Sequence, residues 1–376
     1  MAKRSSYFYV EIPGFEPGLR EPKSLVLPLH HISALDDKDT TIFRFIQKSV
    51  TCVIMGNGIL FMLVLQLLTL TPGASSNLTS KDVDYGQYSG ITRVSYGRYA
   101  VVHDKKNGGG LLFMDFDISL SSGKVSNVSV TELDGTSEIP ICRDPEDVVY
   151  VPSTNTFFVC AEGDQRILEY DVSGRHTGRE LLVPADMGVS CIKPNQGFEA
   201  LAYDENNDLF WTTTESSLLA YENTLHDGRN LLILQSFSAK SLAPLSRMTY
   251  FMDAPEADAA KAISYVHGVP AMVALPDGRL VVMERELYVP KTYLGGWCKV
   301  KLYLVDTIAG DGEKKLLTSF RTKLSAGLRL ANYEGMCLGP VLEDGCRTLL
   351  LISDSQEGAG KGPLRLSDWL KVIKIG

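Results

Sequence analysis

The stretch FEALAYDENNDLFWTTTE, residues 198–215, decides the fold class of this 376-residue chain. Two runs rich in aliphatic, aromatic and β-branched residues, FEALAYD and DLFWTTTE, flank the polar residues ENN. Asn and Asp tolerate the left-handed backbone that tight turns need, so the stretch predicts two antiparallel strands joined by a hairpin turn. A carboxylate lies near each end of this hairpin, Glu199 at its start and Glu215 at its close.

Four further hairpins of this kind lie between residues 88 and 354, and no long stretch has the 3.6-residue periodicity of a helix. Their sequences are SGITRVSY with RYAVVHD, PEDVVYVP with TFFVCAE, HGVPAMVALP with RLVVMERE, and YEGMCLGP with RTLLLISD. One or two more strands follow each hairpin, as LLFMDFDI and KVSNVSV follow the first. The repeating unit is therefore four strands in about 58 residues.

These repeats predict an all-β chain folded as a β-propeller of four-stranded blades, because a radial array protects the strand edges. Five repeats are counted, and six blades are kept as an alternative. The last unit shows only two or three strands, so we expect residues 81–88 to complete it and close the ring. One or two β-sandwiches are the structural alternative, but a sandwich predicts no regular repeat.

The composition excludes several functional classes. The net charge is −8, from 37 Lys and Arg against 45 Asp and Glu, and this argues against a nucleic-acid binder. The seven cysteines and six histidines form no C-x-x-C or H-x-x-x-H pair, so no zinc or iron–sulfur framework is recognisable. The chain also has no G-x-S-x-G elbow of a serine esterase and no G-x-x-x-x-G-K-[ST] nucleotide loop.

An uncharged segment near the N-terminus predicts export. Residues 49–70, SVTCVIMGNGILFMLVLQLLTL, follow a basic flank, and we assign 49–76 as a signal peptide. The alternative is an uncleaved signal anchor, because ~20 apolar residues can span a bilayer. Residues 1–48 are expected to be an unstructured extension and 77–376 the propeller domain. We therefore expect a periplasmic or secreted protein that contacts a membrane only through residues 49–70.

Export permits disulfide bonds among the six cysteines that follow this segment. Cys337 and Cys346 flank a short turn between two strand-like runs, so they are the pair that we predict to be bridged. Buried free thiols are the alternative.

Carboxylates recur where each hairpin starts and where it ends, and these two places lie on one side of an antiparallel pair. The starts are Ser89/Gly90, Glu146, Glu199, Gly268 and Glu334, and the ends are Asp104, Glu162, Glu215, Glu284 and Asp354. The first strand of each propeller blade lines the central channel. We therefore expect these residues around one mouth of the channel, with Asn195 and Asn332 just ahead of two of them.

Crowded carboxylates repel one another unless they are protonated, paired or bridged by cations. One interpretation is bound Ca²⁺, which takes six to eight oxygen ligands. The predicted ligands are Asp104, Glu146, Glu162, Asn195, Glu199, Glu215, Glu284, Asn332, Glu334 and Asp354. The other interpretation is an ion-pair network with Arg143, Arg166, Arg285, Lys105 and Lys106. We favour Ca²⁺ because export brings the domain into calcium-rich surroundings.

Six short motifs in this order resemble the phytase-like domain family, whose members are described as having esterase-like activity of phytase. They are Y-S-G-I at 88–91, D-P-E-D at 144–147, N-Q-G-F-E-A-L-A at 195–202, V-V-M-E-R at 281–285, N-Y-E-G-M at 332–336 and I-S-D at 352–354. The resemblance extends over residues 85–376. It implies a secreted or periplasmic β-propeller whose acidic mouth is similar to that of the calcium-dependent β-propeller phytases.

The resemblance also implies a function, namely Ca²⁺-dependent hydrolysis of a small-molecule ester or phosphoester, here by a monomer. Glu199 and Glu334 would lead the metal ligands and the catalytic residues, and Arg285 or Lys105 would hold phosphate oxygens. His103 is a candidate general base. No dense Lys/Arg motif for phosphate is present, so the substrate stays open. The alternatives are a lactonase-like propeller with a single Ca²⁺ and a non-catalytic binding propeller stiffened by Ca²⁺.

Overall fold

The computed structural model divides the chain into two units, Met1–Leu68 and Thr69–Gly376. The residues that it describes are 32–37, 40–45, 51–55, 58–62, 70–78, 83, 86–104, 110–133, 139, 142–222, 229–307, 313–324, 330–360 and 366–376.

The first unit contains two antiparallel hairpins. They pair β1 (Ile32–Asp37) with β2 (Thr40–Phe45) and β3 (Thr51–Met55) with β4 (Gly58–Met62). β1 and β2 lie within residues 1–48, for which the sequence predicts no regular structure. The signal-peptide or anchor assignment of residues 49–76 stays a prediction.

Among the described residues, no helix combines the length and the apolar character needed to cross a membrane.

The second unit is built from five four-stranded antiparallel sheets. Blades 1 and 2 consist of β6 (Tyr88–Ser95), β7 (Arg98–His103), β8 (Gly110–Ile118) and β9 (Val125–Glu132), and of β10 (Pro145–Val151), β11 (Thr156–Ala161), β12 (Arg166–Asp171) and β13 (His176–Glu180). Blades 3 and 4 consist of β14 (Phe198–Asp204), β15 (Leu209–Thr214), β16 (Leu231–Ser238) and β17 (Pro244–Phe251), and of β18 (Ala262–Ala274), β19 (Leu280–Pro290), β20 (Trp297–Val305) and β21 (Lys314–Lys323). Blade 5 consists of β22 (Asn332–Val341), β23 (Arg347–Asp354), β24 (Trp369–Ile375) and β5 (Leu70–Asn77).

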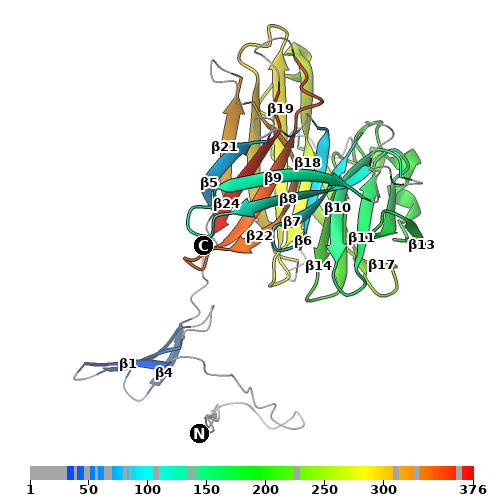
Figure 1. Cartoon of the computed structure of the whole chain (residues 1–376). Helices are drawn as coiled ribbons and strands as arrows, with labels where there is room; N and C mark the ends of the chain where they lie inside the picture. Colours follow the sequence, from blue (N-terminus) through cyan, green and yellow to red (C-terminus); the bar gives the residue numbers. More distant parts are fainter. Residues whose placement is uncertain are drawn as a thin grey trace. The chain divides into compact units, whose positions relative to one another are not determined.

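The blades form a closed ring, which confirms the predicted β-propeller and the count of five blades. Their first strands neighbour one another in the order β6, β10, β14, β18 and β22, and β22 lies beside β6 again. Each blade begins with one of the hairpins read from the sequence (Figure 1). Helical structure in the described part of the chain is limited to the short 3₁₀ turns η3 (Ala185–Met187), η4 (Val189–Cys191), η5 (Leu219–Tyr221) and η6 (Ala259–Lys261).

The core lies between the blades, because neighbouring residues of a strand face opposite sides of its sheet. In β11, Phe157 packs with Val102 of blade 1, while Phe158 packs with Phe210 of blade 3. Blades 3 and 4 meet in the same way through residues such as Trp211. The second strand of a blade is buried on both faces, so its sequence is almost continuously apolar.

The strand that closes the ring is β5, so the expectation that residues 81–88 do so is wrong. β5 forms the outer edge of blade 5 and pairs antiparallel with β24 from Asn77↔Trp369 to Leu70↔Ile375 (Figure 1). Its sequence, LTPGASSN, contains Pro72 and Gly73, which read as a turn. An edge strand tolerates proline. A Cβ on Gly73 would lie 2.4 Å from the carbonyl oxygen of Val372, so the close approach of the two strands requires glycine.

The predicted disulfide does not form, and the six cysteines from Cys142 onward are free thiols. Cys337 pairs with Leu350 within the sheet, whereas Cys346 lies in the turn just before Arg347, whose partner is Val341. The two cysteines therefore do not face each other. Four of the thiols are buried, as the alternative reading expects, namely Cys142, Cys160, Cys298 and Cys337.

Candidate functional site

A β-bulge recurs at the same place in the first strand of every blade. In four blades the pairing of the first two strands skips one residue, which is Ser89, Glu146, Glu199 or Glu334. In blade 4 the shift lies between Gly268 and Ala271. A bulge leaves one residue outside the ladder and redirects its side chain. Three of the predicted carboxylates thus occupy the position that the fold repeats around the channel.

The residues at the ends of the second strands lie beside the bulges of the first strands. The backbone N–H of Asp104 donates to Gln87 O at 3.1 Å, that of Glu162 to Asp144 O at 2.9 Å, and that of Glu215 to Gly197 O at 2.7 Å. Each of these acceptors lies two residues before the bulge. In blade 5 the corresponding pair is Asn332↔Asp354. The structure therefore brings these predicted residues to one end of the channel.

Blade 4 differs from the sequence-based alignment. Gly268 pairs with Arg285, as Asn332 pairs with Asp354, so Arg285 and not Glu284 occupies the equivalent position. Glu284 serves a different network, where it accepts hydrogen bonds from Tyr250 Oη at 2.8 Å, from the backbone N–H of Asp253 at 3.1 Å and from Lys314 Nζ. Glu146, Glu199 and Glu334 are the residues that their strands leave unpaired at the bulge, whereas Gly268 lies before the bulge of β18, which is at residues 269 and 270. Counting from Gly268 therefore places the end of this hairpin one residue too early.

Arg285 joins carboxylates from two other blades. Its Nη2 donates to Glu215 Oε1 at 2.6 Å, and its Nη1 donates to Glu334 Oε1 and, at 3.3 Å, to Asn332 Oδ1. Asn332 Nδ2 also donates to Glu334 Oε1 at 2.7 Å. The Arg285 side chain is only 3% exposed. We call the acidic residues at this end of the channel, together with Arg285 and Asn332, the acidic ring. The half of it that Arg285 joins is an ion-pair network, as the alternative interpretation predicts.

The other half consists of carboxylates arranged in two groups. Oxygens of Asp104, Asp144 and Glu146 lie within 4.8 Å of one another, and so do oxygens of Glu146, Glu162 and Glu199. Glu146 belongs to both groups. Glu162 Oε1 also accepts a hydrogen bond from the backbone N–H of Gly197 at 2.7 Å, which fixes its position. Asp144 is not among the ligands predicted from the sequence, although it precedes Glu146 by two residues, as Asn332 precedes Glu334.

Burial and mutual repulsion raise the pKa values of these carboxyl groups. Burial raises the pKa of Glu146 well above its ordinary value, and repulsion from Glu199, Asp104, Glu334 and Glu162 adds to the rise. For Glu199, burial and the charge of Glu215 raise the pKa while Arg285 opposes them. Burial lowers the pKa of Arg285, but Glu334, Glu215 and Glu199 outweigh it and hold that pKa above its usual value. At neutral pH the ring must therefore keep protons or gain positive charge.

The donor set of the two groups fits a hard divalent cation. Every donor atom is a carboxylate oxygen, and no nitrogen or sulfur takes part. Oxygen-only sites suit Ca²⁺, Mg²⁺ or Mn²⁺, whereas zinc and copper prefer nitrogen and sulfur ligands. Asp144 and Glu199 are partly exposed while Glu146 and Glu162 are buried. Each group therefore combines buried carboxylates with one that solvent can reach.

The remaining predicted residues lie around this centre or outside it. Asp354, 5% exposed, accepts a hydrogen bond from the backbone N–H of Gln356 at 2.5 Å. His103 is the last residue of β7 and is buried beside Asp104. Asn195 is exposed, and the position two residues before Glu199, which matches that of Asn332, is Gly197.

Of the other predicted cations, Arg166 pairs with Glu180 at 2.8 Å, while Lys105 and Lys106 lie outside the described residues.

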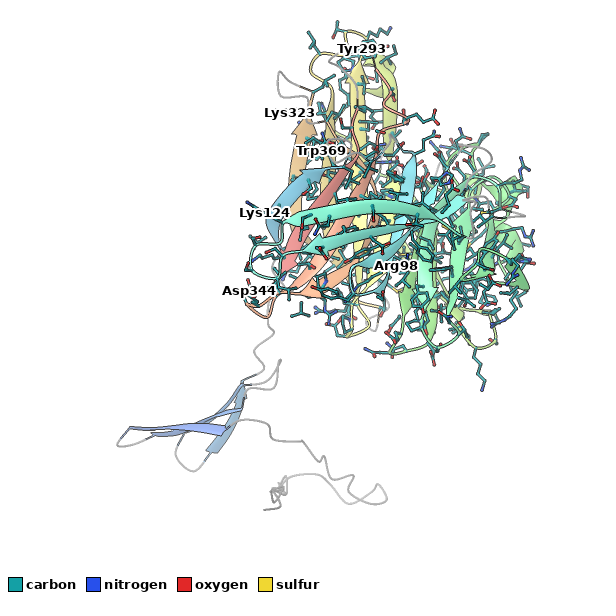
Figure 2. All side chains as sticks on the ribbon, viewed as in Figure 1. Arg98, Lys124, Tyr293, Lys323, Asp344 and Trp369 are labelled. Atoms are coloured by element: carbon teal, nitrogen blue, oxygen red, sulfur yellow. The ribbon has the colours of Figure 1, made fainter. Side chains whose placement is uncertain are left out.

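The ring occupies one end of the channel. Tyr293 and Lys323 mark the upper end of blade 4, and Asp344, in the β22–β23 turn, lies at the lower end of the propeller (Figure 2). Toward the lower end, the channel opens into a cavity of about 160 Å³ lined by residues of all five first strands, including Ile91, Val148, Leu201, Met272 and Met336. The channel is thus acidic at one end and mainly apolar at the other.

A family model described as "Phytase-like: Esterase-like activity of phytase" matches residues 84–356. No curated protein sequence matches the chain.

Among solved structures, the chain matches the catalytic domain of a GH62 α-L-arabinofuranosidase from Coprinopsis cinerea, with 13% identity, coverage of 82% of this chain and 96% of that chain, and a TM-score of 0.43. A second is the PQQ-bound aldose sugar dehydrogenase from Streptomyces coelicolor, with 10% identity, coverage of 93% and 99%, and a TM-score of 0.32.

Proposed function

The chain belongs to the phytase-like family, and from that premise we propose that it hydrolyses a small-molecule ester or phosphoester with the help of Ca²⁺. The observation that carries this proposal is the pair of carboxylate groups that share Glu146 at the acidic end of the channel. Two adjacent positions for hard cations could hold two oxygens of one substrate group.

The residues of the two carboxylate groups would hold the cations, namely Asp104, Asp144, Glu146, Glu162 and Glu199. Bound Ca²⁺ supplies a Lewis acid that polarises the ester or phosphoryl group and lowers the pKa of a bound water. Glu199 is partly exposed and belongs to the second carboxylate group, so it is placed to take a proton from that water. Glu199 is therefore our candidate general base.

We propose for Arg285 a role other than the phosphate binding that the family resemblance implies. Its Nη1 and Nη2 donate to Glu334 and Glu215, and the side chain is almost fully buried. We assign it and Asn332 to the positioning of Glu334, whose side chain is 14% exposed. Substrate oxygens would be held by the cations.

The decisive experiment measures hydrolysis of p-nitrophenyl phosphate, p-nitrophenyl acetate and phytate by the full chain, with Ca²⁺ and with EDTA. Release of p-nitrophenol or phosphate that EDTA abolishes and Ca²⁺ restores would support the proposal. Turnover that is unchanged by EDTA would contradict the role of Ca²⁺. Ca²⁺ binding without turnover of any of the three substrates would instead favour a binding propeller.

We also propose that the protein is a monomer exported to the periplasm or the medium. The uncharged segment 49–70 supports export, and Ca²⁺ is abundant outside the cytoplasm. Fractionation of cells that produce the full chain would test this, because a cytoplasmic location of the folded protein would contradict it.

A further inference from the structure

One of the five equivalent strand-end positions around the channel carries a positive charge. The other four are Asp104, Glu162, Glu215 and Asp354, and the fifth is Arg285. We propose that Arg285 is a built-in substitute for one Ca²⁺, and that it thereby limits how many ions the acidic end of the channel binds. This inference rests on the proposed function only in taking Ca²⁺ as the cation that the remaining carboxylates bind.

The contacts of Arg285 are those expected of a bridging cation. It lies in β19 of blade 4, yet it contacts Glu215 at the end of β15 and Glu334 at the bulge of β22. Its third acceptor, Asn332 Oδ1, is an amide oxygen, which is also a common ligand of Ca²⁺. One buried guanidinium thus gathers three oxygen ligands from two blades, as a metal ion at this point would.

The two halves of the ring differ in how their charge is balanced. Glu215 and Glu334 share the permanent charge of Arg285, since an arginine is not deprotonated in proteins. Within the part of the chain that the structure describes, Glu146 forms no ion pair with a basic side chain. Arg285 therefore compensates Glu215 and Glu334 from within the chain, whereas Glu146, which belongs to both carboxylate groups, is the residue left for exchangeable cations.

Removing the guanidinium should turn the half of the ring that Arg285 joins into a further cation site. In Arg285→Gln, the buried Glu215 carboxylate, the partly exposed Glu334 carboxylate and the Asn332 oxygen would face one another without a positive charge. We expect this variant to bind one more Ca²⁺ per chain than the wild type. The count is read by isothermal titration calorimetry and by metal analysis after dialysis of the full chain. We also expect its melting temperature to fall in EDTA and to recover in Ca²⁺.

Two variants control this comparison. Arg285→Lys keeps the charge and should bind the wild-type number of ions. Arg247→Gln breaks the pair of Arg247 with Asp186, with contacts of 2.5 and 2.6 Å, on the outer strand β17 of blade 3, and should leave the number unchanged. In the double variant Arg285→Gln/Glu334→Gln one ligand of the new site is gone, so the extra ion should be lost again.

The outcomes separate this inference from the proposed function. Equal Ca²⁺ counts for folded wild type and Arg285→Gln would overturn the role of Arg285. If Arg285→Gln folded only with Ca²⁺ present, the ion would be replacing the guanidinium, which supports the role. Failure to fold in both conditions, with a folded Arg285→Lys, would overturn it, because Ca²⁺ could not replace the arginine. A wild type that binds no Ca²⁺ would contradict the proposed function.

Discussion

Glu146 is the residue on which the cation site depends most, because its carboxylate belongs to both oxygen groups. It is 6% exposed at the bulge of β10, where the fold fixes its backbone. Without bound cations such a carboxylate is unfavourable, since burial and four neighbouring acids raise its pKa. The same side chain should therefore destabilise the cation-free domain and stabilise the cation-bound one.

The variant Glu146→Gln tests whether the effect of this side chain on stability changes sign when cations bind. In EDTA its melting temperature should exceed that of the wild type by a few degrees, because one repelling charge is gone. In Ca²⁺ the order should reverse, because both ion positions lose a ligand and the Kd for Ca²⁺ should rise by about tenfold or more. Scanning calorimetry with and without Ca²⁺ measures both effects. Glu180→Gln, which removes an exposed partner of Arg166, is the control and should shift neither. A lower melting temperature in EDTA would contradict the account.

At the scale of single strands, the sequence predicts the pairs of hairpin strands but not their register. Runs such as PEDVVYVP and TFFVCAE identify β10 and β11, because a short apolar run bounded by turn residues is a local signal. A β-bulge shifts the pairing by one residue without a distinctive residue type, so its position is not visible in the hairpin sequence itself. For that reason Glu284 was assigned to the ring in place of Arg285, and Asp144 was not selected.

The closing strand β5 was missed for a related reason. Its partner β24 follows almost three hundred residues later, and only that pairing makes LTPGASSN a strand. Four of the eight residues are Pro, Gly or Ser, which indicate a turn when read alone. Pairing between the two ends of a chain is a long-range interaction that no local pattern predicts.

Gly73→Ala tests how much this pairing contributes. The new Cβ would approach the carbonyl oxygen of Val372 to 2.4 Å, so β5 and β24 must move apart. We expect a loss of roughly 1–3 kcal/mol in the free energy of unfolding, as is typical of overpacking, measured by urea denaturation. The matched control is Gly188→Ala, whose Cβ would meet its nearest atom at 3.4 Å. Equal stability of the two variants would show that β5 is not needed to close the ring.

At the scale of the whole propeller, the acidic residues that contribute to the net charge of −8 are unevenly distributed. Acidic residues gather at one end of the channel, while the other end is mainly apolar. Asp368 adds a further buried carboxylate in blade 5, where it accepts hydrogen bonds from Gly86 N at 2.9 Å and from Ser355 N and Oγ at 2.9 Å each. Burial raises its pKa to about 6 although these hydrogen bonds lower it.

This concentration of buried acids predicts how stability depends on pH. A carboxyl group whose pKa is raised on folding binds its proton more tightly in the folded state. Its contribution is therefore present below its ordinary pKa and is lost as the pH rises through the folded value. For Asp368 that window runs from 3.8 to about 6, and for Glu146 it begins at 4.5.

In EDTA, the melting temperature should therefore fall as the pH is raised from about 4.5 toward neutrality. Millimolar Ca²⁺ should oppose this fall, because an ion that binds only the folded state stabilises it by mass action and binds best when its ligands are ionised. The two melting curves should thus diverge with increasing pH, and scanning calorimetry between pH 4.5 and 8 measures the divergence. A melting temperature in EDTA that rises over this range would mean that the carboxylates are already compensated within the chain. Parallel curves in EDTA and Ca²⁺ would mean that the ring binds no Ca²⁺.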